Sequence, residues 1–423
     1  MSSAPNFATG RGDAIRDRSL TVTHEQLVSD AFGLRTHVPF GAAVALRGRR
    51  ARTVAAAVLA LEGWASRVDL LGPVEDTPED ADRVLVDDTL VSDQTTPASA
   101  TVVSERPATE TPTVWRLFTS GTTGAPKAID HTLASLTRTV QRARGDAGMR
   151  RTWGLVYEPT RLAGMQVLLQ SLSNGDLLLD AASDEPLPER LRWLAEQRVD
   201  SLSATPTLWR QVLQSADPAS LPLRQITLGG EIADQLVLNA LARTFPDARI
   251  THIFASTETG AAFAVNDGRE GFPLSYLSEP PRGVHLEVRD GILFVEAPGT
   301  SAAGPDGFAS TGDLVEVTDD RVIFLGRASG VVNVGGVKVA PEQVEAVLRA
   351  HPDVLDAVVR SRRNAFSGSI LVADVVVTPD ASREALSARL RAHVAAQLPS
   401  AHVPASVKVV PELSTSVTGK AGR

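Results

Sequence analysis

The chain has 423 residues, of which 42 are basic and 50 acidic, so its formal net charge is −8. This acidic balance argues against a general nucleic-acid binder, and the length suits two or three domains of roughly 150 residues each. The absence of cysteine excludes disulfides, thiolate metal sites, iron–sulfur clusters and a cysteine nucleophile. No apolar run has the length of a signal peptide or a membrane span, so we expect a cytoplasmic protein.

The first part of the chain indicates an α/β unit. An amphipathic helix is expected after Thr23, and residues 53–65 are typical of a buried helix. Residues 91–113 are rich in Ser, Thr and Pro, which predicts a surface connection. Residues 114–118 predict a strand, and a glycine-rich loop and a helix near Thr132 follow it. A strand, a glycine-rich turn and a helix in this order are typical of a phosphate cradle.

The middle of the chain alternates between strand and helix patterns. Strands are expected at residues 177–181, 226–230 and 250–255, and helices at 189–198 and 234–245. This alternation favours a parallel sheet flanked by helices.

Between about residues 283 and 324 the pattern changes to short alternating strands. Asp290-Gly291 and Asp319-Asp320 mark the expected hairpin turns, which indicates an antiparallel β subdomain. The fold class is therefore α/β, with mostly parallel sheets, flanking helices and an antiparallel subdomain in a large N-terminal domain.

The last part of the chain predicts a small α+β domain. Helices are expected at residues 341–350 and 382–398, and strands around 354–360 and 370–377. We place the large domain at residues 1–326 and the small, mobile domain at residues 327–423.

The glycine-rich loop carries the strongest chemical signal. Residues Thr119 to Lys127 read TSGTTGAPK, which offers hydroxyls, backbone N–H groups and an ammonium to a polyphosphate. Lysine is rare here: of the 42 basic residues only four are lysines, at Lys127, Lys338, Lys408 and Lys420. The Walker spacing is absent, and taken alone such a loop is more often a flexible linker.

The loop resembles the phosphate loop of the adenylate-forming enzyme superfamily, which includes acyl-CoA synthetases, adenylation domains of nonribosomal peptide synthetases and firefly luciferase. Further segments resemble the family's motifs in the same order along essentially the whole chain: Leu228-Gly229-Gly230-Glu231, Phe254-Ala255-Ser256-Thr257-Glu258, Ser310-Thr311-Gly312-Asp313, Gly326-Arg327, residues 335–342 and Thr418-Gly419-Lys420. Phe254 and Ala255 stand where the family usually has Tyr and Gly.

The resemblance implies a nucleotide site. The loop would hold the β- and γ-phosphates of ATP through Thr119, Ser120, Gly121, Thr122, Thr123, Gly124 and Lys127. Thr257 would bond the α-phosphate, and Glu258 would hold Mg²⁺, a hard cation that prefers oxygen ligands. Gly230, Glu231, Phe254, Ala255 and Ser256 would border the adenine, and Phe254 keeps a ring face for stacking.

Asp313 would accept both ribose hydroxyls, and Arg327 would be a second ribose and phosphate contact. Lys420 would bridge the carboxylate and α-phosphate oxygens in the transition state, although a lysine so near a terminus is usually a solvated charge. Ser329 stands at the family's hinge position, where Asp or Lys is usual. The resemblance therefore implies a domain rotation with a different control, which affects the second half-reaction and not the first.

The acyl pocket is less well defined. Arg161 stands near the family's usual pocket His within Pro159-Thr160-Arg161-Leu162-Ala163-Gly164, so we expect it to pair with a polar or anionic substrate group. An exposed arginine at a helix start is the simpler interpretation. Gly229 and Gly230 would form part of a pocket with small walls.

The resulting prediction is an enzyme that converts a small-molecule carboxylic acid and Mg·ATP into an acyl adenylate and pyrophosphate. A thiol, either coenzyme A or the phosphopantetheine of an acyl carrier protein, would then take the acyl group, and the short chain suits secondary metabolism. A non-thiol acceptor such as an amine, an unusual acid such as nitrite, and a non-catalytic nucleotide sensor stay open as alternatives.

Overall fold

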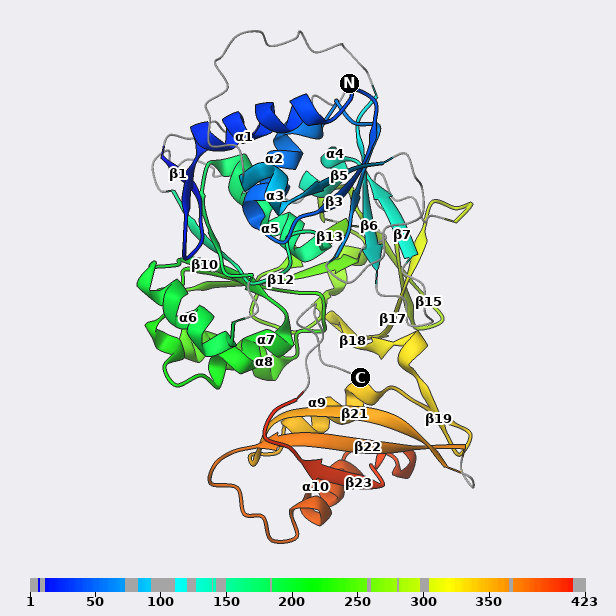
Figure 1. Ribbon diagram of the computed structural model, residues 1–423. Coiled ribbons are helices and arrows are strands. Elements are labelled where there is room, and N and C mark those ends of the chain that lie inside the picture. Colours follow the sequence, from blue (N-terminus) through cyan, green and yellow to red (C-terminus); the bar gives the residue numbers. More distant parts are fainter. Residues whose placement is uncertain are drawn as a thin grey trace.

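The computed structural model describes residues 7, 12–72, 83–92, 111–119, 127–138, 140–141, 150–182, 185–256, 260–279, 281–296, 304–364 and 368–413. Figure 1 shows a large lobe of sheets and helices, and a smaller lobe formed by the chain after strand β18. In the described part of the chain, no helix combines the length and apolar character needed to cross a bilayer.

An eight-stranded sheet forms the centre of the large lobe, in the order β13-β12-β11-β10-β8-β9-β1-β2. Strands β12 to β1 run parallel, and the antiparallel strands β13 and β2 form the two edges. The strands are β1 Asp13–Arg16, β2 Thr21–Thr23, β8 Thr152–Leu155, β9 Leu177–Asp180, β10 Ser201–Ala204, β11 Gln225–Gly229, β12 Arg249–Ser256 and β13 Gly260–Val265. The expected parallel sheet is confirmed.

A second sheet has the order β5-β3-β4-β6-β7 and is parallel except for β7. Its strands are β3 Ala43–Arg47, β4 Arg67–Leu70, β5 Arg83–Asp87, β6 Val114–Thr119 and β7 Lys127–His131. The helix expected near Thr132 is present as α4, which begins at Leu133, but strand β7 lies between it and the glycine-rich loop and was not expected. Residues 128–131 alternate between exposed and buried positions, which suits an edge strand.

Helices fill the space between these two sheets and cover the outer face of the first. One core combines apolar residues of α1, α2 and α5 with residues of both parallel sheets, among them Ile15 of β1 and Val44 of β3. The helices of the large lobe are α1 His24–His37, α2 Ala51–Leu61, α3 Asp88–Ser92, α4 Leu133–Thr137, α5 Leu162–Asn174, α6 Leu187–Glu196, α7 Pro206–Leu213 and α8 Gln235–Thr244. Helix α2 ends earlier than expected because Glu62 is extended and Gly63 has a φ of 67°.

The antiparallel subdomain is a five-stranded sheet in the order β14-β18-β17-β16-β15. Its strands are β14 Phe272–Pro273, β15 His285–Arg289, β16 Ile292–Glu296, β17 Ala309–Val317 and β18 Arg321–Arg327. Both expected hairpin turns are confirmed, since β15 pairs with β16 and β17 with β18.

The small lobe packs helices against a three-stranded sheet, β21-β22-β23, and carries the separate hairpin β19-β20. Its elements are β19 Val332–Val334, β20 Val337–Val339, α9 Pro341–Arg349, β21 Val354–Asn364, β22 Gly368–Val377, α10 Leu386–Ala395 and β23 Ser406–Val409. The helix expected at 382–398 is shorter because Ala385 is left-handed, with a φ of 45°. The predicted α/β fold class is confirmed, whereas the division at residues 326 and 327 remains our proposal.

Candidate active site

The carboxyl ends of parallel strands bring two motif segments together. Gly229 at the end of β11 pairs with Ile253 of β12, so the glycine turn lies beside Phe254 and Ala255. Gly230 has a φ of 81°, a left-handed conformation that favours glycine. In open α/β sheets, ligands bind at such carboxyl ends.

Helix α7 holds the turn that follows β11. Oε2 of Glu231 accepts the Thr207 N–H at 2.9 Å, and the Trp209 indole donates to the Thr227 carbonyl at 2.9 Å. The Arg210 guanidinium donates to the Asp234 carboxylate at 2.6 Å. Thr207, Arg210 and Asp234 were not expected from the sequence, because no local pattern links α7 to this turn.

Tyr157 lies near Glu231 of the same turn and was also missed. It is buried, and its hydroxyl hydrogen-bonds with Ser203. Burial raises the pKa of Tyr157 above its usual range, and the nearby Glu231 carboxylate acts in the same direction. Tyr157 is therefore a neutral hydroxyl at physiological pH.

Phe254 belongs to an aromatic cluster that joins two sheets. Its ring stacks on Phe263 of β13 with centroids 5.2 Å apart, and on Phe324 of β18 with centroids 5.3 Å apart. Phe272 packs edge-on to Phe263 at 5.0 Å. The cluster fixes the antiparallel subdomain against the end of β12, where the adenine is expected.

Asp313 and Arg327 lie side by side, as their shared predicted role requires. They are partners across β17 and β18, and the Arg327 Nε lies 3.2 Å from the Asp313 carboxylate. Gly312, with a φ of 70°, and a bulge between Leu314 and Val315 set this geometry. A second Arg327 nitrogen donates to the Thr311 carbonyl at 2.5 Å.

The strands on either side of the phosphate loop form a hairpin. Thr119 and Lys127 are backbone partners, so the ends of the loop meet. Arg116 on β6 binds Asp130 on β7 at 2.6 Å, and this hydrogen bond lowers the pKa of the Asp130 carboxyl. The predicted loop residues Ser120, Gly121, Thr122, Thr123 and Gly124 lie outside the described residues.

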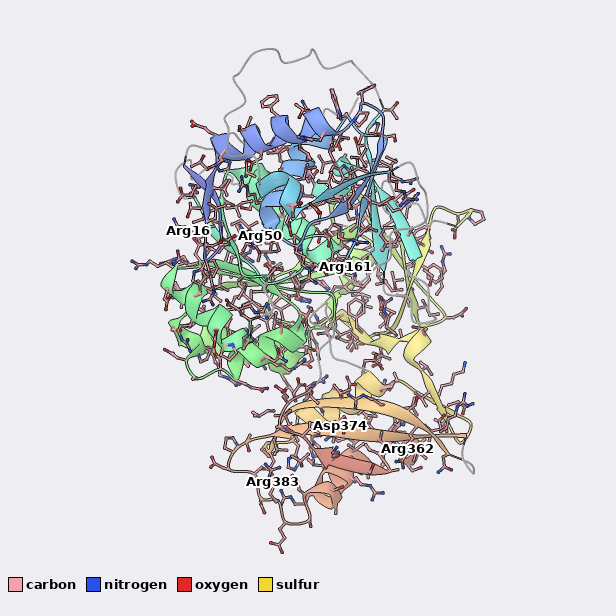
Figure 2. All side chains as sticks on the ribbon, viewed as in Figure 1. Arg16, Arg50, Arg161, Arg362, Asp374 and Arg383 are labelled. Carbon is pink, nitrogen blue, oxygen red and sulfur yellow. The ribbon has the colours of Figure 1, made fainter. Side chains whose placement is uncertain are left out.

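Arg161 is neither fully exposed nor free. It precedes α5, one guanidinium nitrogen donates to the Phe118 carbonyl at 3.0 Å, and its Nε lies 3.5 Å from Glu158 Oε2. Figure 2 marks Arg161 near the middle of the large lobe. The residue therefore ties the end of β6, just before the phosphate loop, to the start of α5.

Three residues with predicted catalytic or metal-binding roles, Thr257, Glu258 and Lys420, lie outside the described residues. Ser256 is described only as the backbone partner of Gly260. Within the described ranges, no group of three or more His, Asp or Glu side chains is placed to hold a metal.

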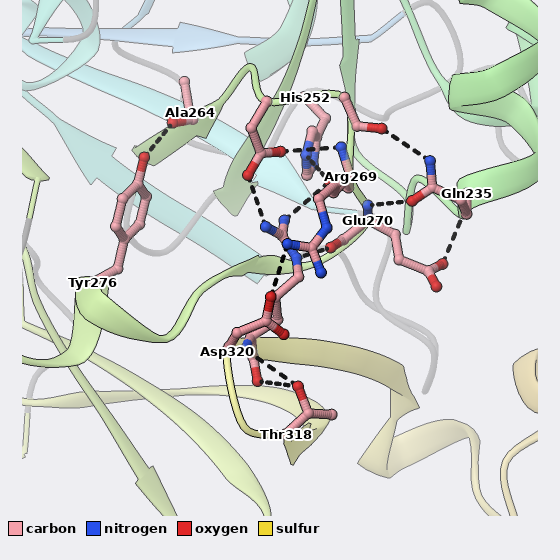
Figure 3. A network of polar contacts seen from close by, with 11 residues as sticks. Gln235, His252, Ala264, Arg269, Glu270, Tyr276, Thr318 and Asp320 are labelled. Carbon is pink, nitrogen blue, oxygen red and sulfur yellow. Dashed lines mark hydrogen bonds and ion pairs between the residues drawn. The ribbon is translucent and has the colours of Figure 1, made fainter.

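A second polar network lies behind the site, between α8 and the antiparallel sheet (Figure 3). The backbone N–H of Gln235 donates to Glu270 at 3.0 Å, and the Glu270 N–H donates back to the Gln235 side chain at 3.1 Å. His252 bonds the Arg269 carbonyl, and burial lowers the pKa of its imidazole, so it is neutral at pH 7. The buried Arg321 binds Asp267 at 2.7 Å and fastens the same loop to β18.

Comparisons with known proteins agree with this arrangement. The AMP-binding enzyme family matches residues 47–291, and the AMP-binding enzyme C-terminal domain matches residues 343–420. A probable 2-succinylbenzoate–CoA ligase of Mycobacterium tuberculosis H37Rv is 32% identical over 72% of this chain and 81% of its own length. A 4-chlorobenzoate–CoA ligase of Arthrobacter is 27% identical over 66% of this chain and 59% of its own length.

The fold also matches solved structures. The amide bond synthetase McbA from Marinactinospora thermotolerans superimposes with a TM-score of 0.75 at 20% identity, covering 98% of this chain and 96% of that protein. The matched domains, the relatives and the geometry at the ends of β11 and β12 lead to one conclusion: this chain belongs to the AMP-binding enzymes, the adenylate-forming superfamily, and is an acid–thiol ligase of the acyl-CoA synthetase type.

Proposed function

We propose that this ligase activates an aromatic carboxylic acid with a polar or acidic ring substituent and transfers the acyl group to coenzyme A. The observation that carries the acid class is the 32% identical relative, which is named for 2-succinylbenzoate. The relative named for 4-chlorobenzoate also has a ring-substituted benzoate as its acid. Both names specify coenzyme A, which favours it over a carrier protein as the acceptor.

In the first half-reaction, a carboxylate oxygen of the acid attacks the α-phosphorus of ATP and pyrophosphate leaves. Lys127 and the hydroxyls of its loop bind the β- and γ-phosphates, and Thr257 bonds the α-phosphate. Lys420 stabilises the charge that develops between the carboxylate and the α-phosphate. In the second half-reaction, the thiol sulfur attacks the acyl carbon and AMP leaves.

Asp313 and Arg327 bind the ribose. Asp313 is only 9% exposed and offers acceptors to the two hydroxyls, while Arg327 holds the carboxylate from the neighbouring strand. Gly229, Gly230 and Glu231 form one wall of the acyl and adenine pocket, and Phe254, Ala255 and Ser256 form the other.

Mg²⁺ is the proposed metal partner of the nucleotide, with Glu258, which lies outside the described residues, as its protein ligand. Glu258 supplies one carboxylate, and magnesium is usually bound by one or two carboxylates together with substrate phosphates, not by an all-protein cage. When bound with the nucleotide, the ion would neutralise phosphate charge.

Arg161 would recognise the ring substituent. Its guanidinium is held between the Phe118 carbonyl and Glu158, and the side chain is 21% exposed. A guanidinium is planar and carries five N–H donors, a geometry that suits a carboxylate. Replacing Arg161 would therefore weaken the binding of acids that carry such a substituent more than the binding of unsubstituted benzoate.

Acid-dependent ATP–pyrophosphate exchange tests both parts of the proposal. The panel comprises benzoate, 4-chlorobenzoate, 2-succinylbenzoate, malonate, fatty acids and amino acids. We expect exchange with substituted benzoates and formation of the corresponding CoA thioester. Exchange confined to fatty or amino acids, or no exchange with any acid, would contradict the acid class.

The role of Arg161 is tested with Arg161→Leu and Arg161→Lys, and with Arg224→Leu as the matched control at an exposed arginine. We expect Arg161→Leu to raise KM for the substituted acid about tenfold or more and to leave KM for benzoate unchanged. An equal rise in KM for benzoate, the substituted acid and ATP would instead show that Arg161 only positions the end of β6.

A further inference from the structure

A cluster of buried charges joins the two lobes. Asp234, which caps the N-terminus of α8, binds Arg210 of α7 at 2.6 Å. The same carboxylate oxygen lies 3.3 Å from Nε of Arg349, which ends helix α9 of the small lobe. The three side chains are only 11–12% exposed. One aspartate of the large lobe is thus shared by an arginine from each lobe.

The cluster contains more carboxylates than these. Asp356 lies 3.8 Å and Glu345 3.7 Å from the Arg349 guanidinium. Each also accepts a backbone N–H, from Ala357 at 2.8 Å and Val359 at 2.9 Å respectively. Arg349 therefore lies among three acidic groups, two from its own lobe and one from the other.

The electrostatics show that the groups act on one another. Burial opposes the charge of Asp234, but Arg210 and Arg349 outweigh it and lower the pKa of its carboxyl. Burial likewise opposes the charge of Arg210, while Asp234, Asp356 and Glu231 raise its pKa. Asp356 belongs to the small lobe and Glu231 to the glycine turn. Arg210 therefore interacts electrostatically with both of these parts of the molecule.

The cluster is continuous with the predicted acyl and adenine turn. Asp234 ends the turn that begins at Gly229, and α7 holds this turn through Glu231 and Thr227. On the opposite side, Gln235 is fixed by its paired hydrogen bonds with Glu270 (Figure 3). The turn is therefore held from two sides by the large lobe, and Arg349 adds a contact from the small lobe.

We propose that Arg349 is a positioning residue for adenylation: by binding Asp234 it holds the small lobe in the orientation described here and fixes residues 229–234 beside the acid and nucleotide. The inference rests on the proposed role of this turn. Acid and ATP must both be held before they react, so the contact acts on the first half-reaction. Transfer also brings two reactants together, the acyl adenylate and the thiol, but it does not use Lys420, which follows β23 along the chain and is proposed to act during adenylation, so we expect transfer to depend less on the contact.

The test uses variants on both sides of the contact. Arg349→Met removes the cation, and Arg349→Lys keeps a charge with a different shape. Asp234→Asn removes the anion but keeps an oxygen that can accept the Val237 N–H, as Asp234 does at 3.0 Å. Arg389→Met is the matched control, because Arg389 binds Asp353 at 2.5 Å within the small lobe.

Two readouts are needed. The half-reactions are measured separately, as pyrophosphate exchange and as thioester formation from added acyl adenylate. Lobe orientation is measured by spin-label distances between cysteines introduced at the exposed positions Ser220 and Ser387, one in each lobe. The native chain has no cysteine, so these are the only sites labelled.

We expect Arg349→Met and Asp234→Asn each to lower kcat of exchange roughly tenfold, to leave thioester formation within twofold, and to broaden the distance distribution. The double variant should be little worse than either single variant, Arg349→Lys should recover part of the rate, and Arg389→Met should behave as wild type. Equal losses in both half-reactions, additive effects or an unchanged distance distribution would overturn the proposal. If wild type showed no exchange with any acid, the proposed function would fail, while the distances would still decide whether the contact sets lobe orientation.

Discussion

Gly164 of α5 allows the helix to pass very close to the chain that precedes it. A Cβ at this position would lie 2.1 Å from the Glu158 carbonyl oxygen, 2.7 Å from its carbon and 2.9 Å from the Pro159 Cα. All three are backbone atoms, so no side-chain rotation can relieve the clash. Gly164→Ala must therefore move α5 away from residues 158–159 by about 1.3 Å, the difference between the 2.1 Å approach and an ordinary contact of 3.4 Å.

The magnitude follows from two opposing effects. Alanine favours an ordinary helix over glycine by about 1 kcal/mol, whereas forcing a methyl group into a packed site costs about 1–3 kcal/mol or more. Because the methyl group would clash with the backbone carbonyl carbon and oxygen of Glu158, we expect the cost to be near the upper end of this range. The free energy of unfolding should therefore fall by about 2 kcal/mol. The displacement also separates Arg161 from Phe118 and Glu158, so KM for acid should rise.

Urea denaturation followed by tryptophan fluorescence measures the stability, and pyrophosphate exchange measures KM. Gly330→Ala is the control, because its Cβ would come no closer than 3.7 Å to any atom and its φ is not left-handed. Its stability should stay within about 0.5 kcal/mol of wild type. A Gly164→Ala variant with wild-type stability and wild-type KM would refute the reasoning.

Two further predictions concern stability. Burial raises the pKa of Asp180 to about 6, although its carboxylate accepts the Ala51 and Ala182 N–H groups. The folded chain therefore binds this proton more tightly than the unfolded chain, so stability falls as pH rises from about 4 to 6, by at most about 3 kcal/mol. Asp180→Asn should reduce the difference between the free energies of unfolding measured in urea at pH 5 and pH 7.5. An unchanged difference would contradict the raised pKa of Asp180. Arg321→Met removes a buried guanidinium that donates to Asp267 and to the backbone carbonyls of Glu270 and Arg269, and it should cost about 1–3 kcal/mol in thermal or urea unfolding because these acceptors lose their donor. Arg269→Met, at an exposed pair with Asp320, should leave stability close to that of wild type. Equal losses in the two arginine variants would contradict the role of burial.

Sequence patterns located the parts of the site that lie at strand ends. The turn at Gly229 and the segment at Phe254 were predicted where β11 and β12 end, because strand periodicity and glycine signals are local. The pairing of Asp313 with Arg327 likewise follows from a hairpin whose turn is visible in the sequence.

The missed features depend on contacts between distant segments. Strand β7 was missed because it is a short edge strand between the glycine-rich loop and α4, and its pairing with β6 is not visible in a local pattern. Arg210, Asp234 and Arg349 come from three helices, and no periodicity relates them. The bond of Arg161 to the Phe118 carbonyl was also missed, because it depends on how α5 packs against the second sheet.

The central claim is that this chain joins a carboxylic acid to AMP, and the most direct measurement is acid-dependent ATP–pyrophosphate exchange by wild type and Lys420→Ala, with the nucleotide product identified. We predict exchange that requires a substituted benzoate, release of AMP once thioester forms, and a loss of roughly 10²-fold or more in the variant. Release of ADP, or no exchange with any acid despite binding of Mg·ATP, would contradict the account.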